Sequence, residues 1–261
     1  MTPKPETKAK KPALPRLTTK QVMAELKAAG TAQNIKTFGN HGVTGDFFGV
    51  SYAFLKQLHR RVKSDHELAL ELWQTGNHDA RVFACWAADG DKTTMKLLNQ
   101  WAQDVDNHVL AIELASLAQD TDLAHRIMAK WIARKVEWPS SMGWGVASRL
   151  AMQPSRGSDE GGITEAQVGE LLTKLEAGIQ SAPNYTRHNM NNALISIGCR
   201  PKWKTKAIAA AKRIGKVEVN YGATSCSVTD AAARIEKTTS HYASRGKSPT
   251  DGTGGKRRRH C

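Results

Sequence analysis

The sequence predicts an all-α protein, and more specifically an α-solenoid in which short helical hairpins stack side by side. The first observation is that apolar residues recur with helical spacing nearly throughout the chain. One such stripe consists of Val50, Phe54, Leu55, Leu58 and Val62. The second is a weak repeat, because Trp73, Trp101 and Trp131 are spaced 28 and 30 residues apart and each precedes a polar turn and another apolar helix. Units of this kind bury their apolar faces on their neighbours, as in a solenoid, although a globular helical bundle is an alternative.

Capping residues indicate where the individual helices begin and end. Thr18 and Asp65 suit the N-cap position, while Gly30 and Gly76 suit the position just past a helix end. In chain order we expect helices over residues 18–29, 31–37, 50–62, 65–75, 78–89, 91–102, 106–119, 121–134, 138–152, 163–181, 184–198, 202–215 and 228–240.

The chain is expected to form one helical domain between two basic tails. Residues 18–240 carry the helical pattern, whereas 1–17 and 241–261 are rich in Lys, Arg, Pro, Gly, Ser and Thr and are expected to be disordered. Inside the domain only residues 217–219 have the pattern of a strand, and the Gly- and Ser-rich stretch 153–162 is the clearest loop.

Composition excludes several classes of protein. No stretch of the 261 residues approaches the ~18 apolar residues of a membrane-spanning helix, so no membrane association is expected. The N-terminus has no apolar core, which argues against a signal peptide. The 4 cysteines lie far apart and the 9 histidines form no His-x-x-x-His pair. We therefore expect neither a disulfide framework, a metal site nor a cofactor, and a cytoplasmic location.

Positive charge is unevenly distributed. The net charge is +14, of which residues 1–20 and 244–261 supply +10, since each segment has six Lys/Arg and one acid. Residues 64–122 contain eleven Asp/Glu against three Lys/Arg, whereas residues 187–216 contain eight Lys/Arg and no acid. A basic surface in the C-terminal half is the footprint expected of a polyanion binder.

The expected helix after Pro201 is the most informative segment for binding. At about 100° per residue its cations fall within an arc of roughly 80°, opposite its apolar residues. The predicted phosphate contacts are Lys202, Lys206, Arg213 and Lys216, extended by Arg187, His188 and Arg200. A Lys-rich surface helix that serves only solubility is the alternative, but the absence of interleaved acids favours nucleic acid, with salt-dependent affinity.

Several segments resemble the bacterial DNA alkylation repair family, whose members are built from HEAT-like helical repeats. These segments are FGVSYAFLK at 48–56, HELALELW at 66–73, GNHDAR at 76–81, DVDN at 104–107, NNALISIG at 191–198 and IGKVEV at 214–219. Each motif alone is weak, but their order along residues 39–237 is specific. The resemblance implies an α-solenoid of HEAT-like hairpins that binds duplex DNA on a concave basic surface, as a nucleoid-associated bacterial monomer. The characterised enzymes of that family are glycosylases for N3- and N7-alkylated purines.

The resemblance also places the family's functional positions on this chain. Its catalytic Asp falls on Ile112 and the Trp four residues earlier on His108, while a later Trp falls on Asn192 and an Arg on Ser141. The implied pocket is therefore lined by His108, Ile112, Ser141, Trp144 and Asn192. Because an isoleucine cannot stabilise the charge that develops on the sugar, the expected glycosylase chemistry lacks its main group.

Another carboxylate could replace the missing one. Asp106 is the candidate, although an acid near the start of a helix is also expected for structural reasons, because it can cap the helix and interacts favourably with the helix dipole. Glu113 lies roughly 100° around the helix from Ile112 and would point elsewhere. The leading hypothesis is a DNA-binding protein of the alkylation-repair type. The alternatives are an active alkylpurine glycosylase that uses Asp106, and a solenoid scaffold for protein partners.

Overall fold

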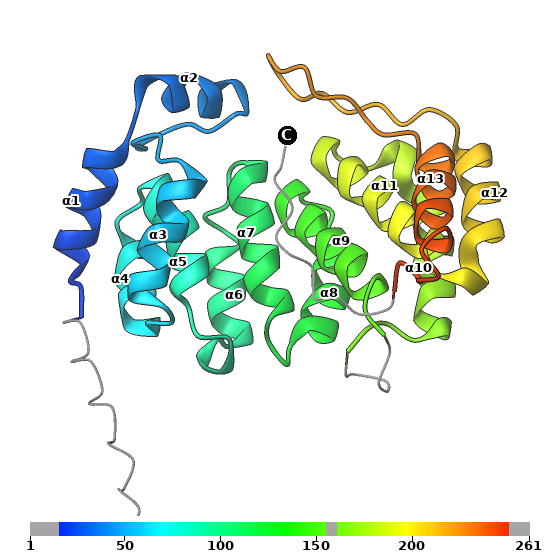
Figure 1. The fold of residues 1–261 in the computed structure, drawn as a ribbon, viewed down its shortest axis with the longest axis horizontal. Helices are drawn as coiled ribbons and strands as arrows, with labels where there is room; N and C mark the ends of the chain where they lie inside the picture. The colour runs from blue at the N-terminus through cyan, green and yellow to red at the C-terminus, as the bar shows by residue number, and fades with distance from the viewer. Residues whose placement is uncertain (1–15, 155–160, 251–261) are drawn as a thin grey trace, which may run out of the picture.

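The computed structural model describes residues 16–154 and 161–250, and the regular structure in this part of the chain is almost entirely helical (Figure 1). Its thirteen α-helices are α1 Thr19–Ala29, α2 Ala32–Asn40, α3 Tyr52–Val62, α4 His66–Gln74, α5 His78–Ala87, α6 Met95–Trp101, α7 His108–Gln119, α8 Ala124–Ile132, α9 Glu137–Ala151, α10 Glu165–Gly178, α11 Asn184–Gly198, α12 Lys204–Ile214 and α13 Ala231–Ala243. Short 3₁₀ helices cover Gly90–Lys92, Ile179–Ser181 and Pro201–Trp203. The all-α fold is confirmed, and no helix among the described residues is long and apolar enough to cross a membrane.

The expected strand at residues 217–219 does not form. Residues 217–219 carry no β-type pairing, whereas Gly30 and Val50 form an isolated bridge. Side chains of α11 instead bind the extended segment that follows α12. The Asn184 amide donates to the Asn220 carbonyl and accepts from the Asn220 N–H, each at 2.7 Å, so a side chain and not a neighbouring strand pairs with the backbone just after residues 217–219.

Capping side chains account for the boundary shifts. The expected helix 91–102 is a 3₁₀ turn followed by α6, because Thr94 accepts from the Leu97 N–H at 3.1 Å and starts a new helix. Asp230 caps α13 in the same way, through the Ala233 N–H at 2.7 Å, so this helix begins at Ala231 and not at the expected residue 228. It ends at Ala243, beyond the expected end at residue 240. Most of the two expected tails lies outside the described residues, namely 1–15 of the tail 1–17 and 251–261 of the tail 241–261.

The helices pair into hairpins that stack in two layers (Figure 1). Helices α5, α7, α9, α11 and α13 each pack directly on the next, and α3 packs on α5, so we call these six the inner layer. The outer layer consists of α4, α6, α8, α10 and α12, each packed on its hairpin partner. Neighbours on the concave side of a curved stack lie closer together, which is why the inner layer is the continuous one.

The repeated tryptophans hold the hairpins of the outer layer together. Trp73, Trp101 and Trp131 lie at or near the ends of α4, α6 and α8, and each is at most 2% exposed. The rings of Trp73 and Trp101 stack at 4.1 Å, and Trp73 Nε1 donates to Asp104 at 2.7 Å. The sequence repeat therefore corresponds to a structural repeat with a buried ring in each unit.

Two irregular segments extend past the N-terminal ends of the inner helices (Figure 1). We call residues 41–48, after α2, the N-terminal overhang, and residues 217–230, between α12 and α13, the C-terminal overhang. The C-terminal overhang reaches the start of the N-terminal one, where a Cβ on Gly222 would lie 3.1 Å from the carbonyl oxygen of Asn40, the last residue of α2. Residues from the two ends of the domain thus come together over one edge of the inner layer.

Candidate nucleic-acid interface

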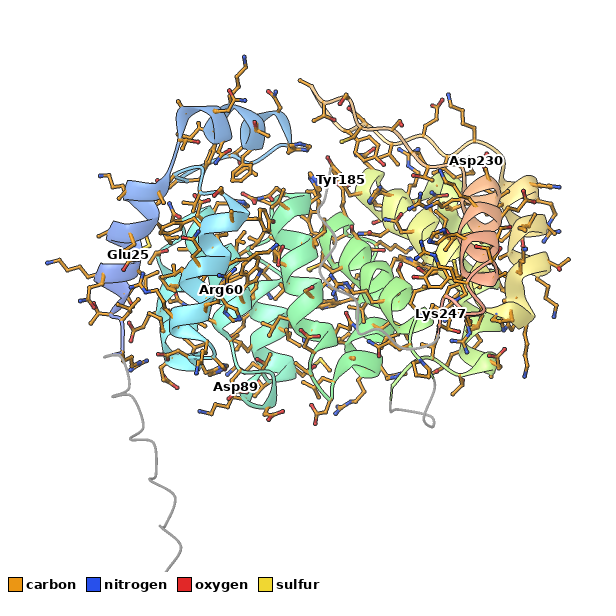
Figure 2. The ribbon with its side chains drawn as sticks, viewed as in Figure 1. Glu25, Arg60, Asp89, Tyr185, Asp230 and Lys247 are labelled. Carbon is orange, nitrogen blue, oxygen red and sulfur yellow. The ribbon has the colours of Figure 1, made fainter. Side chains whose placement is uncertain are left out.

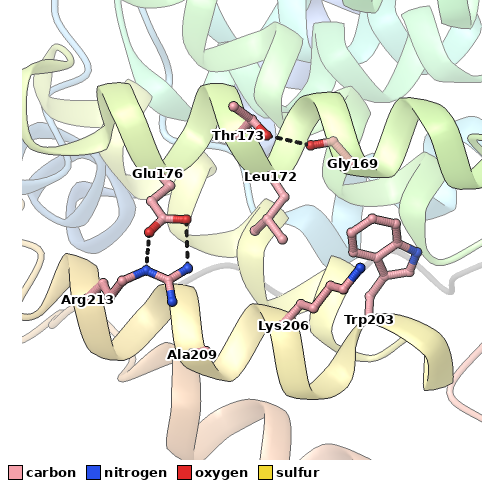
Figure 3. A pocket seen from close by; sticks show the side chains of 8 residues that line it. All are labelled: Gly169, Leu172, Thr173, Glu176, Trp203, Lys206, Ala209 and Arg213. Carbon is pink, nitrogen blue, oxygen red and sulfur yellow. Dashed lines mark hydrogen bonds and ion pairs between the residues drawn. The ribbon is translucent and has the colours of Figure 1, made fainter.

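The predicted cationic stripe lies on the outer layer and faces acids of α10. Figure 3 shows Lys206 and Arg213 of α12 at a cleft of about 430 Å³ between the two helices. Arg213 forms a two-point ion pair with Glu176, with Nη2 3.0 Å from Oε2, and this guanidinium lowers the pKa of Glu176. Lys206 Nζ lies 4.9 Å from the ring centre of Trp203. One cation of the stripe is therefore neutralised by a residue 37 positions away in the chain.

Two further predicted contacts are also paired with acids. Arg200 is buried, donates to the Ala151 carbonyl at 3.2 Å and pairs with Glu165 at 2.7 Å, so it fixes the start of α12 against α9 and α10. Lys216 is exposed and pairs with Glu218 at 2.9 Å. Only Lys202 and Lys206 of the stripe are exposed without an ion pair among the described residues.

Arg187 and His188 lie beside the C-terminal overhang. Arg187 is half-buried at a second cleft, of about 820 Å³, which Lys212 and Lys216 also line. Its Nε is buried and has no hydrogen-bond partner among the described residues. Burial lowers the pKa of His188, whose Nδ1 lies 2.7 Å from the Tyr221 hydroxyl. His188 is therefore neutral near pH 7 and adds no positive charge to the predicted row.

A set of cations that the sequence analysis missed lies on α3, at the other end of the inner layer. Lys56 and Arg60 are exposed, as is Lys63 directly after the helix, and none forms an ion pair with a described residue. Arg60 is labelled in Figure 2. They share one side of the helix with Tyr52, whose ring lies 5.7 Å from that of Trp86 on α5. Lys56, Arg60 and Lys63 are four and three residues apart, a spacing that places side chains on one face of a helix and could have been recognised in the sequence.

The positions implied by the family resemblance fall into two groups. Ser141 and Trp144 are buried in α9, with Trp144 in the core, so they support the inner layer and line no open surface. Ile112 is half-buried on α7. His108 stacks on Tyr185 at 4.7 Å, and Asn192 Nδ2 lies 3.0 Å from His188 Nε2. His108 and Asn192 thus belong to one chain of contacts, which runs through Tyr185, Tyr221 and His188.

The nearby carboxylates have structural partners. Glu113 is 3% exposed and accepts from the Tyr52 hydroxyl at 3.2 Å and from Trp86 Nε1 at 2.5 Å. Burial, followed by the Glu113 charge, raises the pKa of Tyr52 above its ordinary range. Asp106 is exposed and accepts from the Asn107 side chain at 2.7 Å. Asp106 does not cap α7, because Asn107 is the N-cap and accepts from the Leu110 N–H at 3.0 Å.

Comparison with known families identifies the chain. The family model described as DNA alkylation repair enzyme matches residues 20–240. The chain belongs to the DNA alkylation repair family. Uncharacterised proteins of Listeria innocua and Listeria monocytogenes are 35% and 32% identical to it over 228 residues, which is 85% of this chain and 97% of each relative.

A solved structure of this family type superposes on most of the protein. It has a TM-score of 0.79 and 27% identity, and the match covers 89% of this chain and 97% of the other. It is described as belonging to a new family of proteins related to the HEAT-like repeat DNA glycosylases with affinity for branched DNA structures. The expectation of a HEAT-like solenoid is therefore confirmed.

Proposed function

We propose that this alkylation-repair protein binds DNA, prefers branched DNA to linear duplex, and does not excise bases. The observation that carries the proposal is the match, over 89% of the chain, to a structure from a family with affinity for branched DNA. The inner layer of α-helices supplies the surface, with its continuous packing of α3 through α13.

The absence of base excision is supported by the side chains around Ile112. The half-buried isoleucine offers no charge or hydrogen bond to a developing sugar cation. The Glu113 carboxylate already accepts hydrogen bonds from Tyr52 and Trp86, so it is not free to replace the missing group. The exposed Asp106 lies before the helix that carries Ile112, and therefore not beside Ile112 on that helix. Binding without excision is therefore favoured over a glycosylase with a displaced carboxylate.

Phosphate contacts are expected from the unpaired cations. We assign this role to cations of the inner layer, namely Lys56 and Arg60 of α3 and Arg187 of α11. Lys202 and Lys206 lie at the outer layer and are not assigned to it. Each neutralised phosphate adds about 0.9 to the slope of log affinity against log salt. Arg213 is excluded from this set, since Glu176 already holds it.

The experiment measures fluorescence anisotropy with a labelled four-way junction and a linear duplex of the same sequence, at several salt concentrations. We expect tighter binding to the junction and a salt slope that falls by about 2 in the double variant Lys56→Gln, Arg60→Gln. Arg213→Gln is the matched control and should retain the native slope. Equal affinity for both substrates contradicts the preference for branches, and a double variant with the native slope contradicts the assigned contacts.

A second experiment tests the chemistry. Duplex DNA that contains N3-methyladenine or N7-methylguanine is incubated with excess protein, and free base is measured. We expect no release above the spontaneous rate. Release that is lost in Asp106→Asn would support the glycosylase alternative, and negligible affinity for any DNA would support the protein-scaffold alternative.

A further inference from the structure

Six aromatic and imidazole rings meet where the two overhangs cross the edge of the inner layer. We call them the rim cluster, and they come from the N-terminal overhang, α7, α9, α11 and the C-terminal overhang. The members are His41, His108, Trp138, Tyr185, His188 and Tyr221.

Tyr185 is the centre of the cluster. Its ring is parallel to that of His108 within 5° at 4.7 Å, and it stacks on Trp138 at 5.4 Å with a tilt of 29°. Tyr221 approaches it edge-on at 6.2 Å. In Figure 2 Tyr185 lies at the opening between the two overhangs, at the start of α11. Because its neighbours fix the ring, it loses little freedom when a ligand binds.

Both overhangs contribute a ring and are positioned by ordinary hydrogen bonds. The Tyr221 hydroxyl lies 2.7 Å from His188 Nδ1, and the two rings meet edge to face at 5.6 Å. His41 lies 5.6 Å from His108 on the opposite side. The cluster therefore exists only because the chain's N-terminal and C-terminal parts converge there.

The rim cluster is a surface feature and not part of the core. His41, Trp138, Tyr185 and Tyr221 are half-buried, whereas the tryptophans of the outer layer are fully enclosed. Val136, two residues before Trp138, is 58% exposed and is one of two large hydrophobic residues so exposed among the described residues. A continuous, partly exposed aromatic surface marks a binding site. The exposed cations Arg134 and Lys135 precede α9, which suits a ligand that carries phosphates.

We propose that the rim cluster stacks on unpaired bases at the centre of branched DNA. This inference rests on the proposed function and names the feature of the DNA that is recognised. A linear duplex keeps the faces of its bases within its own stack, whereas bases at a branch point can unstack and present theirs. Stacking on a protein ring changes affinity by about 5- to 150-fold per base.

The test uses a three-way junction with two unpaired adenines at its centre, one of them replaced by 2-aminopurine. We expect native protein to quench this fluorophore on binding, because its emission falls when it stacks. Tyr185→Leu and Tyr221→Ala should each weaken junction binding by at least about 5-fold and reduce the quenching, with duplex affinity unchanged. Tyr242→Ala, which removes a half-buried tyrosine of α13 outside the cluster, is the matched control and should bind as the native protein does.

Two further measurements separate recognition from a purely structural role. Tyr221→Phe keeps the ring but loses the hydroxyl contact with His188, so it should retain quenching and affinity even where its melting temperature falls. If the rings only hold the overhangs together, Tyr185→Leu and Tyr221→Ala will lower the melting temperature yet bind and quench as the native protein does, which refutes the inference. Native protein with no preference for junctions would instead refute the proposed function itself.

Discussion

Asp79 determines how the N-terminal overhang joins the inner layer, and its removal should be among the most destabilising single changes. Its side chain, in a residue 1% exposed, accepts three backbone N–H groups: Phe48 at 2.6 Å, Gly49 at 3.1 Å and Val50 at 3.0 Å. Asp79→Ala leaves these donors without an acceptor, and each buried unsatisfied group costs about 1–3 kcal/mol. We expect a loss of about 4 kcal/mol, toward the lower end of the summed range of about 3–9 kcal/mol, because water can reach the partly buried Phe48 N–H.

The free energy of unfolding should be measured by urea titration at 25 °C, together with thermal melting. For a domain of this size about 4 kcal/mol corresponds to a decrease of about 8–16 °C in melting temperature. Asp46→Ala is the control, since the exposed Asp46 carboxylate accepts only the Asn77 side chain, at 3.1 Å, and should cost less than about 1 kcal/mol. Equal losses in the two variants would refute the argument from backbone satisfaction.

Two more predictions follow from groups whose pKa is shifted. Burial and Glu113 raise the pKa of Tyr52 above its ordinary 10.0, so the folded state favours the neutral phenol and loses stability as pH rises past that value. Urea titrations between pH 8 and 11 should show that the free energy of unfolding falls more steeply with pH in the native protein than in Tyr52→Phe, by up to about 1.4 kcal/mol per pH unit. Parallel plots of this free energy against pH for the two proteins would refute the prediction. Arg200, with Trp203, lowers the pKa of Glu165 below 4.5, so the stability from this pair is present above that value and is lost as pH falls. Glu165→Gln should lower the free energy of unfolding by about 1 kcal/mol at pH 7, a modest amount because the carboxylate is half exposed. The difference in stability between the native protein and this variant should vanish near pH 3. If it persists at pH 3, the charge of the pair is not its cause.

Local signals in the sequence were sufficient for most of the fold. Helical periodicity and capping residues located every long helix, and the tryptophan repeat predicted the hairpin stack. The failures occurred where a side chain acts on distant backbone. Asn184 binds the backbone of Asn220, just after the segment expected to be a strand, and this pairing of residues 36 positions apart cannot be read from the sequence.

The candidate site was predicted less well. The stripe of α12 is uninterrupted by acids in the sequence, yet Glu165 and Glu176 reach it from α10. Lys56 and Arg60 were overlooked because α3 was examined only for its apolar face. The rim cluster has no sequence signature, since its rings come from positions between 41 and 221 that share no motif.

The sequence by itself determined that this protein is an all-α solenoid of the alkylation-repair type. Those properties depend on periodicity and residue identity, which are local. The tertiary structure alone decided which cations keep their charge available and which rings gather at the edge of the inner layer. Electrostatic and ring contacts act over a few ångströms in space, and only the folded chain brings residues separated by more than sixty positions within that range.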